Sequence, residues 1–327
     1  MRAVTLHQLR LFNAVARHQS FAAAAREMHL TQPAVSMQIK ELEETIGLPV
    51  FDRAGRNVSL TSAGEYLLVH ARRVLAVLKD AEDTMAKMRG AQTGTLIVGI
   101  VTTAADFLPR MLAAFLREHP GVDVRLVIGN RRSLVDLLHR NEVDLAVMGR
   151  PPRELDTRAE PFAAHPITVF AAPDHPLARE PRFPPERLAN ERFIVREEGS
   201  GTRAAMEVFF REHQLRPHYA MEVASNEAVR HAVSAGLGVA FLSMHTVRQA
   251  CALGEVVALD VAGLPIMRAW HVVQLRARTL SPAAEAFRSS VIENGERFLG
   301  ALFKPTVEAR APRRKAARRA AAARGGG

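Results

Sequence analysis

The stretch SFAAAAREMHLTQPAVSMQIKELEETIG, residues 20–47, decides how the first part of this chain folds. It holds two short helical patterns, and too few residues separate them for the two helices to pack side by side. Ser20 can cap the first helix and Thr31 the second, while Pro33 suits a first helical turn. The alanine run at 22–25 lets the second helix cross closely. This geometry predicts a helix-turn-helix.

The second helix of the motif has one apolar and one polar face. Val35, Ile39, Leu42 and Ile46 form the inward stripe. The residues predicted to face DNA are Gln32, Pro33, Ser36, Met37, Gln38 and Lys40. Amide, hydroxyl and ammonium groups can bond to base edges and phosphates when the start of a helix enters the major groove. An ordinary helical hairpin with a solvated face is the alternative.

The sequence on either side extends the motif. Before it, apolar residues at helical spacing between positions 6 and 16 predict a helix that packs against the other two. After it, LPVFDRAGRNVSLT at 48–61 indicates two short strands around a turn that Gly55 supplies. A basic hairpin beside a recognition helix is a wing, so Arg53 and Arg56 are predicted to reach phosphates or the minor groove. The alternative for either arginine is an ordinary surface position.

A long helix is predicted from Ser62 to Arg89. Its apolar residues alternate steps of four and three, which is the spacing of a two-helix seam. These residues are Leu67, Ala71, Val74, Leu78, Ala81, Met85 and Met88. We therefore expect a homodimer formed through this helix, with a helix lying on its own domain as the alternative. The segment GAQTG at 90–94 ends the pattern.

Beyond residue 94, strand-like and helical patterns alternate, which is typical of parallel sheets with crossover helices. The strand-like runs lie at 95–100, 122–128, 144–149, 167–173, 192–197, 218–223, 238–243 and 267–275. The helical patterns lie near 104–119, 131–141, 202–213, 226–235 and 281–299. The last strand and helix are expected to return the chain to the first lobe. The pattern thus predicts two doubly wound α/β lobes with a cleft between them.

Polar residues gather where these predicted strands end, and in open α/β sheets ligands bind at such ends. The candidate effector-binding residues are Thr102, Thr103, Asn130, Arg131, Gly149, Arg150, Arg153, Gly199, Ser200, Gly201, Thr202, Arg203 and Asn226. Hydroxyls, amides and arginines near helix starts suit a phosphate or carboxylate. Taken singly, a threonine can be only a cap, and an arginine can be only the partner of a nearby acid. Their recurrence at successive strand ends favours a small anionic ligand.

Length, charge and composition limit the class of protein. The 327 residues suffice for two or three domains with their own cores. Residues 1–90 hold 12 Lys and Arg against 9 Asp and Glu, residues 91–303 hold 24 against 24, and residues 304–327 hold 8 against 1. The basic character therefore lies at the two ends. One cysteine, no signal-peptide pattern and no apolar run of membrane length predict a cytoplasmic protein without membrane contact.

The sequence predicts no enzyme, no cofactor and no metal site. Ser200 lies outside any nucleophile-elbow pattern, and the 13 histidines are scattered without a metal-ligand spacing.

The basic residues 304–327 have almost no apolar bulk and are expected to be disordered. They make either a tail that raises solubility or an electrostatic arm for DNA.

Three segments resemble the LysR-type transcriptional regulators: LHQLRLFNAVARHQSFAAAA at 6–25, LTQPAVSMQIKELEETIG at 30–47 and LPVFDRAGRNVSLTSAGE at 48–65. GRPPREL at 149–155 and REEGSGTR at 196–203 are similar to the branch that regulates Calvin-cycle (RubisCO, cbb) operons. The resemblance implies a winged helix-turn-helix, a periplasmic-binding-protein-like (type 2) effector domain, and a homotetramer on two half-sites of double-stranded DNA.

We therefore expect a winged helix-turn-helix at 1–61, a dimerisation helix at 62–90, an effector-binding domain at 91–303 and a basic tail at 304–327. Lobe I covers about 91–164 and 268–303, and lobe II about 165–267. The predicted function is control of carbon-fixation genes in response to a small anionic metabolite, phosphorylated metabolites included. The alternative is a two-lobed solute-binding protein or phosphometabolite enzyme with an N-terminal dimerisation module.

Overall fold

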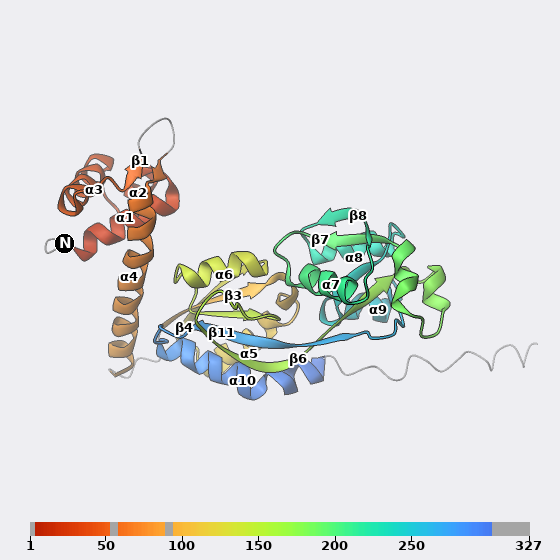
Figure 1. The fold of residues 1–327 in the computed structure, drawn as a ribbon. Helices are drawn as coiled ribbons and strands as arrows, with labels where there is room; N and C mark the ends of the chain where they lie inside the picture. Colours follow the sequence, from red (N-terminus) through yellow and green to blue (C-terminus); the bar gives the residue numbers. More distant parts are fainter. Residues whose placement is uncertain (1–3, 53–57, 89–93, 303–327) are drawn as a thin grey trace, which may run out of the picture.

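The computed structural model describes residues 4–52, 58–88 and 94–302. A helical N-terminal part with one long helix lies beside an elongated α/β part (Figure 1). Arg53 and Arg56 of the predicted wing, and the basic tail at 304–327, lie outside the described residues.

The N-terminal part consists of three helices and a two-stranded hairpin, followed by the long helix. Its elements are α1 (Leu6–His18), α2 (Phe21–Glu27), α3 (Gln32–Ile46), β1 (Phe51–Asp52), β2 (Ser59–Leu60) and α4 (Ser62–Met88). β1 and β2 pair antiparallel, with Phe51 opposite Leu60. The helix-turn-helix and the flanking hairpin expected from the sequence are thus present.

Side-chain caps define where the three helices start. The Thr5 hydroxyl accepts a hydrogen bond from the Gln8 backbone N–H, and the Gln8 side chain accepts one from the Thr5 N–H. Ser20 and Thr31 cap α2 and α3 with their hydroxyls. Gly47 ends α3 at a φ of +80°, a conformation that glycine adopts without steric cost.

Helix α4 departs from the predicted seam in its first half. Leu67 and Ala71 are buried in the core of the chain's own N-terminal part, because α1 packs against this half of α4. Further along, Val74, Val77 and Met85 are 45%, 68% and 50% exposed. The apolar stripe exposed on α4 is therefore shorter than predicted, and it includes Val77, which the spacing did not single out.

The first lobe of the α/β part is built around β3 (Gly94–Val101). This strand pairs in parallel with β4 (Val122–Gly129) and β5 (Leu145–Met148). Helices α5 (Leu108–Glu118) and α10 (Pro282–Leu302) lie on one side of the sheet and α6 (Arg131–His139) on the other (Figure 1). The core between these layers includes Trp270, Phe107, Phe115 and Phe287.

The second lobe has its own core around Phe193 and Phe241. Its elements are the short 3-10 helices η2 (Pro176–Arg179) and η3 (Pro185–Asn190), the strands β7 (Arg192–Arg196), β8 (His218–Val223), β9 (Ala240–Ser243) and β10 (Val257–Ala258), and the helices α7 (Gly201–Glu212), α8 (Asn226–Ser234) and α9 (Met244–Leu253). β7 and β8 pair in parallel. Backbone hydrogen bonds to Val239 place β7 beside the start of β9.

Two long strands, β6 (Thr157–Ala171) and β11 (Ile266–Leu275), run through both lobes. They pair antiparallel along the whole of β11. β11 pairs with β5 at the lobe I end, and β6 pairs with β9 and β10 at the lobe II end. The lobes are therefore joined by a continuous sheet, and residues in the middle of β6 and β11 lie between them.

Every strand and helix expected in the α/β part is present, and some bounds differ. β6 begins at Thr157, because the extended chain continues through Pro161 and Pro166, which obscure the strand pattern. α5 begins at Leu108, because a 3-10 turn at Thr102–Ala104 (η1) precedes it. Helix α9 was not expected. None of the described helices is both long enough and apolar enough to cross a membrane.

Candidate functional site

The polar face of α3 is available on the surface of the N-terminal part. Gln32, Pro33, Met37 and Lys40 are exposed, and Ser36 is half-buried. Because Val35 and Ile39 are fully buried on the other face, the orientation of the helix is fixed by its core. The first three turns of α3 thus present an amide, a hydroxyl and a cation on one side, as a helix that reads the major groove requires.

Two of the predicted DNA-facing side chains on α3 already have partners within the helix. The Gln38 amide donates to Glu41 Oε2 at 2.8 Å. The Lys40 ammonium lies 3.7 Å from Glu44 Oε1 in an exposed pair. Such surface pairs are weak, so either side chain can exchange its partner for a phosphate at little cost in free energy.

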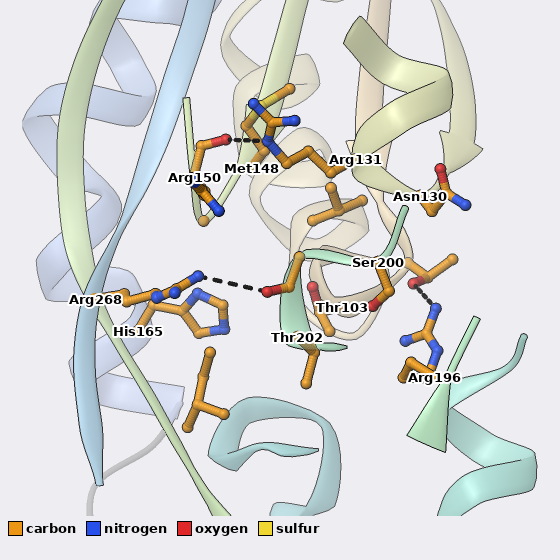
Figure 2. Close-up of a pocket in the computed structure, with 15 residues that line it drawn as sticks. Thr103, Asn130, Arg131, Met148, Arg150, His165, Arg196, Ser200, Thr202 and Arg268 are labelled. Atoms are coloured by element: carbon orange, nitrogen blue, oxygen red, sulfur yellow. Dashed lines mark hydrogen bonds between the residues drawn. The ribbon is translucent and has the colours of Figure 1, made fainter. Parts of the chain in front are cut away.

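A cavity lies between the two lobes, and its lining comes from both lobes and from the crossing strands (Figure 2). The lining residues are Val101, Thr102, Thr103, Asn130, Arg131, Met148, Gly149, Arg150, His165, Ile167, Arg196, Ser200, Gly201, Thr202 and Arg268. The cavity volume is about 30 Å³. The predicted inter-lobe cleft is therefore present and narrow.

Nine of the thirteen candidate effector-binding residues line this cavity: Thr102, Thr103, Asn130, Arg131, Gly149, Arg150, Ser200, Gly201 and Thr202. The other four lie outside its lining. Arg153 is exposed on the loop after β5, and Gly199 and Arg203 line a neighbouring surface hollow. Asn226 lies at the start of α8, in a larger hollow that shares Thr102 with the cavity.

The cavity is strongly basic. Four arginines line it, from α6, from the loop after β5, from β7 and from β11, and its lining contains no acidic residue. Arg131 pairs with Glu154 at 3.0 Å and lowers the pKa of that carboxyl to about 2 through their hydrogen bond. Arg196 pairs with Glu197 at 2.7 Å. These two cations are neutralised by their neighbours.

The remaining two arginines of the cavity, Arg150 and Arg268, have no acidic partner among the residues that the structure describes. Burial and the nearby Arg150 lower the pKa of the Arg268 guanidinium. The only hydrogen bond found for the Arg268 side chain in the described part of the chain goes to the Gly201 carbonyl at 3.4 Å. Two uncompensated cations on one cavity wall favour an anion as the missing partner.

The start of α7 forms the opposite wall of the cavity. The Ser200 hydroxyl caps this 12-residue helix by accepting from the Arg203 N–H. The N–H groups of its first turn have no partner inside the helix, and they carry the positive end of the helix dipole. The Thr202 side chain is buried next to them. An anion in the cavity would therefore meet backbone donors as well as arginines.

The start of α5 does not offer the cavity free backbone N–H groups as the start of α7 does. The sequence placed Thr102 and Thr103 at the start of a helical pattern near 104–119. They instead belong to the 3-10 turn η1, and α5 starts six positions later at Leu108. The Thr102 hydroxyl accepts hydrogen bonds from Arg196 at 3.1 Å and from Asn226 at 3.4 Å. Because Arg196 and Asn226 belong to lobe II, these bonds hold the two lobes together.

Two models of known protein families match this chain, one in each part of the molecule. Residues 6–65 match the model of the bacterial regulatory helix-turn-helix proteins of the lysR family, and residues 89–296 match the model of the LysR substrate binding domain. The chain belongs to the LysR family. This LysR-family protein is a DNA-binding transcriptional regulator and not an enzyme, since its curated relatives are named as transcriptional regulators.

Individual relatives of this LysR-family chain cover nearly its whole length. It is 47% identical over 300 residues to the HTH-type transcriptional regulator CfxR of Cupriavidus necator, which covers 92% of this chain and 95% of that one. It is 45% identical over 295 residues to the RuBisCO operon transcriptional regulator of Allochromatium vinosum, covering 90% and 98%. Among solved structures, the Synechocystis PCC6803 CcmR regulatory domain in complex with 2-PG matches with a TM-score of 0.60 at 36% identity, covering 62% of this chain and 97% of that one.

Sequence reasoning missed three charged or polar lining residues of this LysR-family cavity: His165, Arg196 and Arg268. His165 and Arg268 lie inside strands β6 and β11, and Arg196 ends β7. The sequence does show a charged or polar residue inside each of these otherwise apolar strands, and such a residue must find a partner when it is buried. The sequence alone does not show which cavity the side chain faces.

Proposed function

We propose that this LysR-type regulator acts in the cytoplasm on carbon-fixation (RubisCO) genes and that its action depends on a small phosphorylated anion bound between the lobes. The names of the relatives support the choice of genes. The 2-PG (2-phosphoglycolate) in the CcmR regulatory domain supports the choice of ligand. The observation that carries the proposal is the pair of arginines, Arg150 and Arg268, that face the cavity without an acidic partner.

Calorimetric titration of the full chain with 2-phosphoglycolate tests the ligand. Arg268→Gln and Arg150→Gln are each expected to weaken binding roughly tenfold or more, because each removes a charge-assisted hydrogen bond. Arg153→Gln is the matched control, since Arg153 follows the same strand but lies outside the cavity lining. Equal affinities for Arg268→Gln, Arg150→Gln, Arg153→Gln and wild type would remove the two cavity arginines from the ligand site.

The reading face of α3 gives a separate expectation for DNA. Gln32→Ala and Ser36→Ala should each reduce discrimination between operator and random DNA by about 1 to 3 kcal/mol, because each removes a base contact. Lys40→Ala should weaken binding to both DNAs about equally, since an ammonium bound to phosphate reads no sequence. Competition gel shifts measure both effects. Unchanged operator preference in both alanine variants would contradict the proposed reading face.

We propose that the exposed stripe of α4 pairs two chains. Val74 and Val77 are exposed apolar residues on a 27-residue helix that extends beyond the N-terminal core. A partner helix on this stripe would hold two α3 helices at a fixed spacing, which suits two half-sites. Two such dimers on adjacent sites make the tetramer.

A path of direct contacts joins the cavity to the helix-turn-helix. Helix α6 begins at the cavity with Arg131. The chain after α6 carries Glu142, which forms an ion pair with Arg72 of α4 at 2.5 Å. The Arg72 Nε atom also donates to Asn13 of α1 at 3.1 Å. A ligand that moves α6 would therefore change a contact shared by lobe I, α4 and α1.

Glu142→Gln is expected to reduce the ligand-induced change in DNA footprint while leaving the affinity for 2-phosphoglycolate unchanged, because the substitution lies outside the cavity and weakens only the Arg72 pair. Glu82→Gln is the control, since it alters an exposed pair between α4 and Arg10 of α1 that does not involve lobe I. Footprinting with and without 2-phosphoglycolate measures the response. A full response in Glu142→Gln would rule out this route.

A further inference from the structure

His165 is a buried histidine whose ring has no hydrogen-bond partner in the part of the chain that the structure describes. Its side chain lies on the crossing strand β6 and is 4% exposed. Neither Nδ1 nor Nε2 is bonded to protein. Buried polar atoms are almost always hydrogen-bonded, because leaving them unpaired forfeits the bonds that water would make. The ring lines the inter-lobe cavity and points into it beside Arg268 (Figure 2).

The surrounding structure holds this ring in one orientation. It stacks on Trp270 with ring centroids 3.9 Å apart and planes inclined by 16°. Trp270 is itself fixed, because its Nε1–H donates to His245 Nδ1 at 2.9 Å. In addition, a Cβ atom on residue 149 would lie 2.5 Å from His165 Nδ1, so Gly149 leaves the space that the ring occupies. The position of the two nitrogens is therefore set before any ligand binds.

The neighbours of His165 determine what the ring can offer. Burial, with smaller contributions from His245 and Arg268, lowers the pKa of His165 to about 3. The ring is thus neutral at physiological pH and presents one N–H donor and one acceptor. Arg268, on the paired strand β11, reaches from the same wall toward the start of α7, where its guanidinium bonds to Gly201. An anion beside Arg268 would find a directional neutral donor next to a cation.

We propose that His165 contacts the ligand directly, donating a hydrogen bond to an oxygen of the anion that Arg268 holds. This inference rests on the proposed function, because it assigns a further binding residue within the same cavity. The competing explanation is that His165 only packs against Trp270. The two explanations differ in whether the ring nitrogens matter, and substitutions can separate them.

The test compares His165→Phe with His165→Gln by calorimetric titration of the full chain with 2-phosphoglycolate. Phenylalanine keeps a ring that can stack on Trp270 but has no nitrogen, whereas glutamine keeps a neutral N–H donor. We expect His165→Phe to bind roughly tenfold more weakly or worse and His165→Gln to recover most of the loss. Equal affinities for wild type and His165→Phe would overturn the inference.

A spectroscopic readout makes the test independent of folding defects in the variants. In the wild-type chain labelled with ¹⁵N-histidine, the His165 resonances are assigned by their absence from the His165→Phe spectrum. Adding 2-phosphoglycolate should shift the ¹⁵N resonance of one ring nitrogen of His165, because a new hydrogen bond forms there. If 2-phosphoglycolate binds but both ring resonances stay unchanged, this inference is overturned while the proposed function stands. If the wild type does not bind 2-phosphoglycolate at all, the proposed ligand class fails and this inference fails with it.

Discussion

Replacing Asp144 with alanine is expected to lower the free energy of unfolding of the α/β part by about 3 to 5 kcal/mol. Asp144 precedes β5 and forms an ion pair with Arg278, which follows β11; their side chains are 8% and 10% exposed. The carboxylate also accepts the backbone N–H of Ile97 at 2.6 Å. Removing it leaves the Arg278 guanidinium buried without its acid and leaves the Ile97 N–H without its acceptor.

Urea denaturation followed by the fluorescence of Trp270 measures this loss, because Trp270 is the only tryptophan of the chain and is buried in the lobe I core. Asp156→Ala is the matched control. Asp156 pairs with Arg276 at 3.1 Å, but their side chains are 77% and 64% exposed. Such an exposed pair contributes about 0 to 1 kcal/mol. Similar losses in the two variants would contradict the assignment of a buried ion pair.

Acidification from pH 7 to pH 5 is expected to destabilise the α/β part through two buried histidines. Burial lowers the pKa of His165 to about 3 and that of His245 to about 4, from the ordinary histidine value of 6.5. Below pH 6.5 the unfolded chain binds protons on both rings and the folded chain does not. The free energy of unfolding is therefore unaffected by these histidines above pH 6.5. It falls as the pH drops below 6.5, until about pH 4 for His245 and about pH 3 for His165.

The size of the effect follows from linkage. Each histidine should cost about 1.4 kcal/mol per pH unit below 6.5, so the pair should cost about 4 kcal/mol between pH 6.5 and pH 5. His165→Phe should retain about half of this dependence, since only His245 still titrates. Urea denaturation without ligand at pH 7 and pH 5 measures the free energy of unfolding of the wild type and of His165→Phe. The other titrating groups are the same in both proteins, so their effects cancel when the two pH dependences are compared. A pH dependence that is unchanged in His165→Phe would contradict the lowered pKa of His165.

The N-terminal part illustrates how far local sequence can predict structure. Ser20 and Thr31 were expected to cap α2 and α3, and each does so with its hydroxyl. Thr5 caps α1 in the same way. Capping depends on residues two or three positions away, so it can be recognised without knowing the rest of the fold. The seam on α4 was less predictable. Leu67 and Ala71 fit a partner helix by spacing, but α1 of the same chain covers them.

The cavity shows where local reasoning stops. Asn130 and Arg150, which follow strands of one parallel sheet, line the cavity, because the carboxyl ends of parallel strands meet at one edge of a sheet. Thr202 lines it from the second lobe. The role of Thr102 was not predictable. Its hydroxyl bonds to Arg196 and Asn226, which lie in the other lobe.

By itself, the sequence determined the helix-turn-helix and the order of the strands and helices other than α9 and β10, and it predicts an anionic ligand, since these inferences depend on spacing along the chain. Only the tertiary structure decided that His165 and Arg268 face the same cavity. The two residues are far apart in sequence and meet because β6 and β11 pair antiparallel, with His165 opposite Arg268 in the register. Pairing between distant strands is set by packing of the whole sheet, so no short stretch of sequence encodes it.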